Sequence, residues 1–340
     1  MALGAGRPTV RDVAAVAGVS PTTVSHALNG KGRVDERTRR RVEDAASRIG
    51  YRANVVARNL RAGRTGMLSL VLPTIGHDVH ANEALGLDYY MRLASAAAAA
   101  AFAHDHALLL PPPLQSVADL RDLPIDGGIL ADPEMNDSRL SMFHALGLPV
   151  VTIERDLGAD DDAWCVTSDN SANTRMVLEH LADRGARRIA LLAPDARLAW
   201  VEDTSRTFES WTKAHGRPAL IVPVPHEHLE GSAYASTLQV LDRPDPPDAI
   251  FAVSEGYAGG ALRAARERGL RVPGDLMLVA GVDSQQASAS DPPITALDLH
   301  PAEHATAAVE LLVARLTGND SKRTRSVKGT LRIRASTDPA

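Results

Sequence analysis

The sequence predicts an α/β protein in which a small helical domain precedes two lobes built on parallel sheets. Short, capped helical patterns fill roughly the first 50 residues. From Met67 onward, apolar runs typical of buried strands alternate with segments of helical periodicity, which is the pattern of parallel sheets with crossover helices. The chain has 340 residues, 44% of them hydrophobic, and its roughly 270 residues of α/β pattern favour two lobes over one.

A tight turn joins the first two predicted helices. Residues 10–17 (VRDVAAVA) place small apolar side chains on one face, and Gly18 suits the left-handed conformation that ends such a helix. Ser20 is a good N-cap, and Pro21 occupies the first helical position, where its missing N–H costs nothing. The second helix therefore runs over residues 21–28, and the short link predicts a helix-turn-helix.

Asp35 caps a third predicted helix, whose apolar positions follow helical spacing from Val42 to Ile49. Its arginines, Arg37 and Arg39 to Arg41, fit either a contact with nucleic acid or a solvated face. Residues 54–61 (NVVARNLR) are compatible with two helical turns, but an isolated helix shorter than about 12 residues is marginal in water. We therefore expect a hinge that becomes ordered only when something packs against it.

The remaining elements alternate regularly along the chain. The predicted strands read MLSLVLP, HALLLP, GGILA, PVVTI, RIALLAP, ALIVPV, AIFAVS and LMLVAGV. Between them we expect an Ala-rich helix and further helices over residues 173–184, around Phe208 and Trp211, and over 232–241, 257–268 and 301–316. Open α/β sheets bind ligands beyond the carboxyl ends of their strands, so we expect a ligand cleft between the two lobes.

Charge is distributed unevenly along the chain. Residues 1–65 carry 13 Lys and Arg against 5 Asp and Glu, a net charge of +8, whereas the remainder carries 24 against 37, a net charge of −13. Such asymmetry indicates that the N-terminal segment contacts a polyanion while the rest avoids one. Nucleic acid is the leading candidate for that partner.

Composition excludes several classes of protein. A single cysteine, Cys165, excludes a disulfide framework and a Cys-rich zinc site, and it suits a reducing compartment. No apolar run approaches the roughly 18 residues of a membrane span, and the N-terminus lacks the apolar stretch of a secretory signal. We therefore expect a cytoplasmic protein with no membrane partner.

Neither a metal site nor a cofactor site is predicted. The pairs His77/His80 and His226/His228 lack Cys or carboxylate partners at ligand spacing, so solvated loops are the better interpretation. The sequence has no G-x-G-x-x-G or G-x-x-x-x-G-K-[ST] motif after a strand, and no G-x-S-x-G elbow. We therefore expect neither a nucleotide enzyme nor a serine hydrolase.

Residues 9–61 (TVRDVAAVAGVS to NVVARNLR) resemble the headpiece and hinge of the LacI/GalR family almost position for position. The body resembles the family's periplasmic-binding-protein-like effector domain through PVVTIER, HLADRGARRIALL, LRVPGDLMLVAGVDS, PPITALDLHP and LRIRAST. The resemblance implies a sequence-specific transcription regulator, a repressor whose affinity for its operator changes when a small molecule binds between the lobes. It also implies a homodimer on a near-palindromic operator in double-stranded DNA.

The resemblance assigns DNA contacts residue by residue. It implies that base edges are read by Pro21, Thr22, His26 and, through insertion into the minor groove, Leu60. It implies contacts with phosphates or the groove edge for Val10, Arg11, Ser20, Thr23, Ser25, Asn29, Thr38, Asn54 and Ala57. His26 stands where many members have Arg, so we expect a specificity different from theirs. Leu60 is also compatible with an ordinary core position.

Effector contacts follow from strand ends and from the resemblance. Thr74, Glu154, Arg155, Glu255 and Asp283 follow strands, and the resemblance adds Arg206 and Thr207. Thr207 occupies the position where the family has an Arg four residues before an aromatic, here Trp211, and the adjacent Arg206 is the expected substitute. Carboxylates and Arg in a cleft suit a hydroxyl-rich ligand, and Trp200 or Trp211 would stack on a sugar face.

The resulting domain prediction has three parts: a headpiece over 1–50, a hinge over 51–65 and an effector-binding and dimerisation domain over 66–340. Lobe one is expected over about 66–168 and 297–324, and lobe two over about 169–296 and 325–340. Three alternatives remain. The bundle alone fits a protein-interaction domain, the body fits a solute-binding protein that does not act on DNA, and an α/β enzyme would need a catalytic constellation that the sequence does not display.

Overall fold

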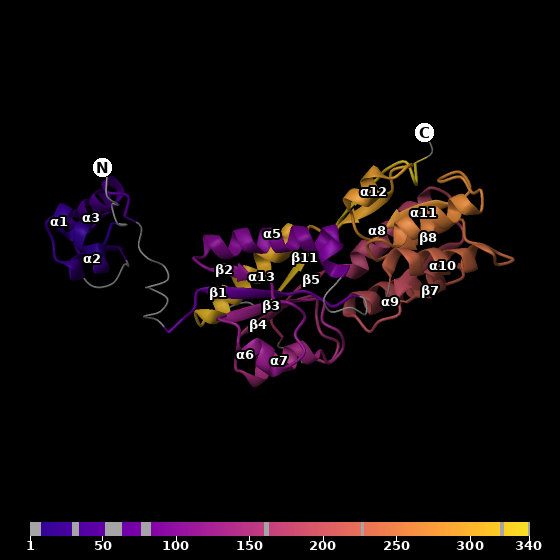
Figure 1. Cartoon of the computed structure of the whole chain (residues 1–340). Coiled ribbons are helices and arrows are strands. Elements are labelled where there is room, and N and C mark those ends of the chain that lie inside the picture. The colour runs from indigo at the N-terminus through magenta and orange to yellow at the C-terminus, as the bar shows by residue number, and fades with distance from the viewer. Residues whose placement is uncertain are drawn as a thin grey trace, which may run out of the picture. The chain divides into compact units, whose positions relative to one another are not determined.

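The computed structural model describes residues 8–28, 34–51, 63–75, 83–159, 163–225, 228–319 and 323–338. The chain forms two compact units, the N-terminal unit Met1–Gly66 and the C-terminal unit Met67–Ala340 (Figure 1). In the described part of the chain, no helix combines the length and the apolar character needed to cross a membrane.

The N-terminal unit is a three-helix bundle of α1 (Val10–Ala17), α2 (Pro21–Leu28) and α3 (Glu36–Arg48). Each helix begins where a cap predicts it. Thr9 and Asp12 form a capping box on α1, Ser20 accepts a hydrogen bond from the amide of Thr23, and Asp35 accepts one from the amide of Thr38. Gly18 ends α1 at φ 62°. The core consists of small aliphatic residues, namely Val13, Ala14, Ala17, Val24, Ala27, Val42, Ala45 and Ala46.

Lobe one of the C-terminal unit is a six-stranded parallel sheet in the order β11-β5-β4-β3-β1-β2. Its strands are β1 (Met67–Val71), β2 (Ala107–Leu109), β3 (Gly127–Ala131), β4 (Val150–Ile153), β5 (Cys165–Ser168) and β11 (Thr324–Val327). Its helical elements are η1 (Glu83–Gly86), α5 (Asp88–Ala103), α6 (Val117–Arg121), α7 (Ser138–Ala145) and α13 (Pro301–Leu316). Cys165 is buried in β5.

Lobe two has the sheet order β12-β10-β9-β8-β6-β7, parallel except for β12. Its strands are β6 (Ile189–Pro194), β7 (Leu220–Val224), β8 (Ala249–Ala252), β9 (Met277–Ala280), β10 (Thr295–Asp298) and β12 (Thr330–Arg332). Its helices are α8 (Asn170–Asp183), α9 (Ala199–Ala214), α10 (Leu229–Leu241), α11 (Tyr257–Glu267) and α12 (Gln285–Ala289). The predicted α/β fold, with an N-terminal helix-turn-helix and two parallel-sheet lobes, is confirmed.

The chain passes between the lobes three times: after β5, after β10 and between β11 and β12. Two boundaries differ by a few residues from those expected. Residues 297–298 belong to lobe two because β10 continues to Asp298, and residues 325–327 belong to lobe one because β11 pairs with β5. Three connecting segments therefore join the lobes, which is the arrangement of two lobes that move about a hinge.

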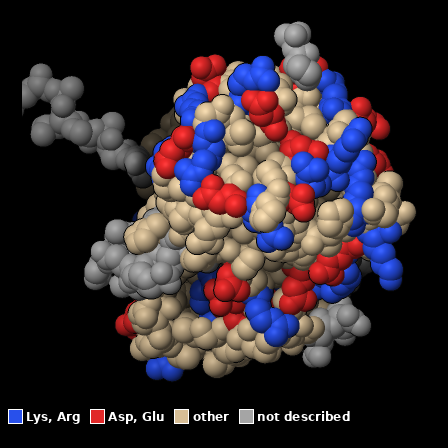
Figure 2. Space-filling model, turned by 90° about the vertical axis from the view of Figure 1, so that its right-hand side faces the viewer, with Lys and Arg blue, Asp and Glu red and all other residues tan. Residues whose placement is uncertain are grey.

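Acidic and basic side chains are interspersed over the face of the molecule in Figure 2. Surface ion pairs of lobe two, such as Arg268–Asp242 at 2.8 Å and Arg271–Asp275 at 2.8 Å, join opposite charges within the lobe. Opposite charges paired in this way offset each other locally.

Candidate functional site

Helix α2 presents a polar face to solvent. Pro21, Thr22 and His26 are exposed, whereas Val24 and Ala27 on the opposite face pack into the bundle core. Thr22 and His26 are four residues apart and therefore lie one above the other on the helix. Short polar groups near a helix N-terminus can reach base edges in a major groove.

The residues expected around this face are positioned by the caps. Ser20 and Arg11 are exposed, whereas Val10, Thr23, Ser25 and Thr38 are half-buried. The hydroxyls of Ser20 and Thr23 lie 2.9 Å apart at the start of α2. That helix end carries partial positive charge and suits a phosphate. Four predicted contacts, Asn29, Asn54, Ala57 and Leu60, lie outside the described residues.

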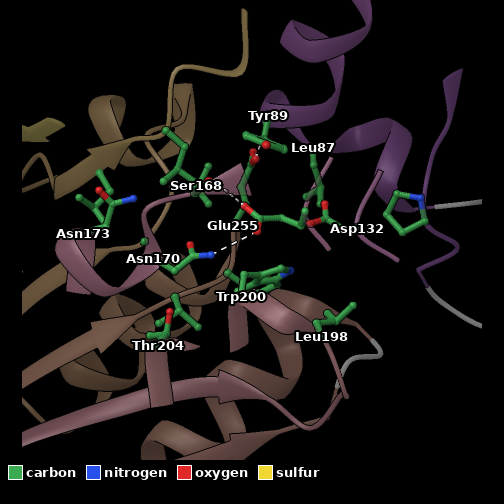
Figure 3. Close-up of a pocket in the computed structure, with 18 of the residues that line it drawn as sticks. Leu87, Tyr89, Asp132, Ser168, Asn170, Asn173, Leu198, Trp200, Thr204 and Glu255 are labelled. Carbon is green, nitrogen blue, oxygen red and sulfur yellow. Dashed lines mark hydrogen bonds between the residues drawn. The ribbon is translucent and has the colours of Figure 1, made fainter. Parts of the chain in front are cut away.

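A cavity lies between the two lobes of the C-terminal unit (Figure 3). It encloses about 990 Å³ between atoms, including its part open to solvent. Its walls come from the carboxyl ends of strands, including Thr74 after β1 and Glu255 after β8, and from Trp200 and Thr204 of α9. Gly281, after β9, also lines it. A Cβ at this position would lie 2.3 Å from the carbonyl oxygen of Val253, so no side chain fits there.

Two acidic residues follow neighbouring strands of lobe one in unusual backbone conformations. Asp132 comes directly after β3 with φ 45°, and Glu154 directly after β4 with φ 64°. A non-glycine residue in this region costs about 1–3 kcal/mol and persists only where the surroundings enforce it. The backbone hydrogen bonds of Asp132 to Ile153 and of Glu154 to Val166 hold both residues in the strand register. Both carboxyl groups consequently reach the cavity.

The two carboxyl groups have different partners. Oδ2 of Asp132 accepts a 2.6 Å hydrogen bond from the Tyr90 hydroxyl, and no hydrogen bond from a described residue reaches its other oxygen. Glu154 accepts hydrogen bonds from the amide of Ser168 at 2.8 Å and from Nδ2 of Asn170 at 3.3 Å.

Burial dominates the electrostatics of these acids. It raises the pKa of Asp132 to about 6, against the opposing effects of the Tyr90 hydrogen bond and of Arg139. It raises the pKa of Glu154 to about 7, with the negative charge of Asp132 adding to the increase. Near neutral pH these groups therefore exchange protons readily, and a bound ligand that supplies hydrogen-bond donors would favour their charged forms.

Glu255 of lobe two caps a helix of lobe one. Its two carboxylate oxygens accept hydrogen bonds from the amides of Asp88 at 2.8 Å and Tyr89 at 3.0 Å. The N-cap residue of α5, Leu87, makes no side-chain cap of its own. The carboxylate therefore satisfies amides that an N-cap side chain usually satisfies, and it lies at the positive end of the helix dipole.

A second polar bridge connects the lobes beside the cavity. Nη2 of Arg155 lies 2.6 and 2.7 Å from the two carboxylate oxygens of Asp203 on α9. The amide of Met135 also donates to the carbonyl oxygen of Arg197 at 3.0 Å. The lobes are thus held together by contacts that a change in lobe angle would break.

Four of the eight predicted effector residues line the cavity, namely Thr74, Glu154, Trp200 and Glu255. The other four do not. Arg155 pairs with Asp203, Arg206 points to solvent with 71% of its side chain exposed, Thr207 is buried against Ser171, and Asp283 pairs with Arg334. Trp211, the alternative stacking residue, packs in the core of lobe two, where its ring stacks on His215.

Sequence reasoning missed several lining residues, above all Asp132, Tyr89, Tyr90, Asn170 and Asn173. The rule that ligands lie at strand ends applies equally to GGILAD, so Asp132 carried a usable signal. The tyrosines carried none, because their position depends on how α5 packs across the sheet.

Comparison with known proteins identifies the family. The model "Bacterial regulatory proteins, lacI family" matches residues 9–54, and "Periplasmic binding protein-like domain" matches residues 178–337. The HTH-type transcriptional regulator AglR of Rhizobium meliloti is 30% identical over 348 residues, covering 97% of this chain and 94% of AglR. The chain belongs to the lacI family of bacterial regulatory proteins.

Further similarities agree with this membership. This lacI-family chain is 30% identical over 329 residues to the regulator CelR of Thermobifida fusca, covering 94% of this chain and 95% of CelR. It matches the solved CelR–cellobiose complex with a TM-score of 0.73 and 27% identity over 97% of this chain and all of that one (100%). The lac repressor dimer bound to operator and ONPF gives a TM-score of 0.72 at 23% identity, covering 98% and 99% of the two chains, which shows the shared fold. This lacI-family chain is a DNA-binding transcriptional regulator.

Proposed function

We propose that this regulator is a homodimeric, cytoplasmic repressor that binds a near-palindromic operator and changes its affinity when a sugar-like molecule occupies the interlobe cavity. The observation that carries the proposal is the exposed polar face of α2, with Thr22 and His26 on it, in a chain that also contains a two-lobed cavity. The first feature suits base reading and the second suits ligand sensing.

On the DNA side, Pro21, Thr22 and His26 read base edges, and Leu60 of the hinge wedges into the minor groove. Phosphate and groove-edge contacts come from Val10, Arg11, Ser20, Thr23, Ser25, Asn29, Thr38, Asn54 and Ala57. Support for this assignment comes from the exposed polar face of α2 and from the uneven charge of the chain. Residues 1–65 carry a net charge of +8 in a protein whose net charge is −5.

The dimer forms through the outer face of α5 and the adjacent edge strand β2. Met91, Ala98, Ala99 and Phe102 are exposed on one side of α5, and the Phe102 side chain is 81% exposed. Leu110, just beyond β2, is 41% exposed. An apolar strip of this kind marks a protein interaction site, and a twofold interface would pair it with the same strip of a second copy.

On the ligand side, Thr74, Glu154, Trp200 and Glu255 contact the effector, joined by Asp132 and Asn170. The other four predicted residues do not line the cavity and would act indirectly, by positioning their neighbours. Arg155 and Arg206 lie beside Asp203, Thr207 bonds to Ser171, and Asp283 pairs with Arg334. A few polar groups among aromatic side chains are typical of a small-molecule site, and the related CelR has been solved with cellobiose.

Fluorescence anisotropy of the full-length protein tests the proposal. The protein is titrated onto DNA from upstream of its own gene, with a scrambled duplex as the control, over 50 to about 200 mM salt. We expect tight binding that depends on both half-sites, falls steeply with salt and changes with one compound of a sugar panel. Weak binding that ignores sequence would overturn the DNA function and favour a solute-binding protein.

A further inference from the structure

We propose that the ligand of the interlobe cavity carries an ammonium group as well as hydroxyl groups, as an aminated sugar or polyol does. This inference rests on the proposed function, since it takes the cavity as the effector site. It concerns the charge of the ligand, which the sugar-like assignment leaves open.

The first observation is the charge balance of the cavity wall. Four acidic residues line it, namely Asp132, Glu134, Glu154 and Glu255, and the described lining residues include no Lys or Arg. Three of the four, Asp132, Glu154 and Glu255, are between 5% and 9% exposed. Buried carboxylates normally have a cationic or hydrogen-bonding partner.

Nearby cations among the described residues have other partners. The guanidinium of Arg139 bonds to the Asp137 carboxylate and to the carbonyl oxygens of Leu72 and Asp132. Arg155 is engaged by Asp203, and Arg92 lies 3.4 Å from the carbonyl oxygen of Asp283. Among the described residues, only the Tyr90 hydroxyl therefore donates a hydrogen bond to the Asp132 carboxylate.

The second observation is an unpartnered donor on the same wall. Asn173 lines the cavity with 3% of its surface exposed, and its side-chain nitrogen has no hydrogen-bond partner in the described part of the chain. Its oxygen is already used by the amide of Gly329 at 3.1 Å. A buried amide N–H needs an acceptor, and a ligand hydroxyl can supply one.

The third observation is the aromatic content beside the acids. Tyr89 and Tyr90 meet edge to face at 5.2 Å on the lobe-one side, and Trp200 and Phe251 line the lobe-two side (Figure 3). Aromatic faces attract organic cations as well as sugar rings. Acids, a free donor and aromatic faces together match a ligand with an ammonium group, hydroxyls and a compact apolar body.

The test compares three probes that differ in charge at one position: D-glucosamine, D-glucose and N-acetyl-D-glucosamine. Binding to the full-length protein is measured by calorimetry at pH 7, and operator binding is measured on the same samples. We expect glucosamine to bind about thirtyfold or more tightly than either neutral probe, the effect of one buried charge pair. Asp132→Asn keeps an acceptor for Tyr90 and should remove most of that preference. Glu209→Gln, on the exposed face of α9, should keep it.

Two results would overturn the inference while leaving the regulator intact. One is a neutral probe that binds as tightly as glucosamine; the other is no saturable binding of glucosamine while operator binding persists. A loss of specific operator binding in the unmodified protein would instead contradict the proposed function, so the two failures are distinguishable.

Discussion

The N-terminal unit and the interlobe cavity use polar side chains in opposite ways. On α2, Thr22 and His26 remain in water and lie above a core of small aliphatic residues. In the cavity, Asp132 and Glu154 are buried, and both sit in left-handed backbone conformations. Exposed contacts with DNA respond strongly to salt, whereas buried carboxyls respond to pH and to the ligand. The two units should therefore be separable by experiment.

The largest effect is expected from the bundle core. Val24→Asn places an amide at a site that is 0% exposed and should cost about 3 kcal/mol or more, comparable with the whole stability of so small a domain. Operator binding should disappear while thermal unfolding of the C-terminal unit stays unchanged. Val16→Asn, at a site 45% exposed, should retain operator binding. A lowered melting temperature of the C-terminal unit in Val24→Asn would contradict the separation of the two units.

The next largest effect is expected from a substitution in the dimer interface. Phe102→Glu places charge on the apolar strip of α5 and should give monomers in sedimentation velocity. Operator affinity should fall about a hundredfold or more, because the two half-sites would no longer be bound together. Ile333→Glu, at a site that is also exposed at 51% but lies in lobe two, is the matched control. A dimeric Phe102→Glu protein would place the interface elsewhere.

Substitution of a base-reading residue should have a smaller effect, limited to binding of the operator sequence. His26→Ala should reduce operator affinity by about 1–3 kcal/mol while leaving binding to a scrambled duplex unchanged. Arg11→Ala should instead weaken both duplexes and lower the salt slope by about 1. Anisotropy titrations on the two duplexes separate these effects. If His26→Ala weakens both duplexes equally, His26 does not read bases.

The contact across the lobes should have a moderate effect. Glu255→Ala removes the cap of α5 and should destabilise the observed arrangement of the lobes by about 0.5–2 kcal/mol, which would increase the radius of gyration in small-angle scattering. Asp169→Ala removes the cap of α8, a bond to the amide of Ala172. That cap lies at the start of lobe two, so its loss should lower the melting temperature without opening the lobes. Identical scattering from Glu255→Ala and the unmodified protein would show that this cap does not hold the lobes.

The smallest effect is the pH dependence of stability. The pKa of Asp132 is about 6 in the folded state, above its usual 3.8, so its contribution is greatest at low pH and is lost as pH rises through about 6. Tyr89 and Tyr90 of α5, Arg139 of α7 and Glu154 are the ionisable groups around it. The ligand-free C-terminal unit should therefore melt a few degrees lower at pH 8 than at pH 5. Asp132→Asn should reduce this difference, and an unchanged difference would place the titration elsewhere.

Local signals in the sequence predicted more of the structure than contacts between distant residues did. Caps and turn residues are local signals, so Gly18, Ser20, Pro21 and Asp35 marked ends of all three helices correctly. The helix predicted over residues 173–184 begins earlier, at Asn170, and Asp169 caps it. The rule that ligands lie at strand ends placed Thr74, Glu154 and Glu255 beside one cavity.

Side-chain direction could not be predicted in the same way. Arg155 and Asp283 also follow strands, but Glu154 and Val282 are the neighbours that face the cavity. On α9, Thr204 faces the cavity, whereas Thr207 lies one turn further along and bonds to Ser171. The cap that Glu255 gives to α5 joins residues 166 and 167 positions apart, and no local pattern encodes such a contact.

A reciprocal titration of the full-length protein tests whether the operator site and the interlobe cavity are coupled. Operator affinity is measured with and without a saturating amount of the sugar or amino sugar that stabilises the protein most, and the affinity for that compound is measured with and without operator. We expect both affinities to change by the same factor, about tenfold or more, because the coupling between two sites is reciprocal. Tight binding of both partners with no change in either affinity would contradict this coupling.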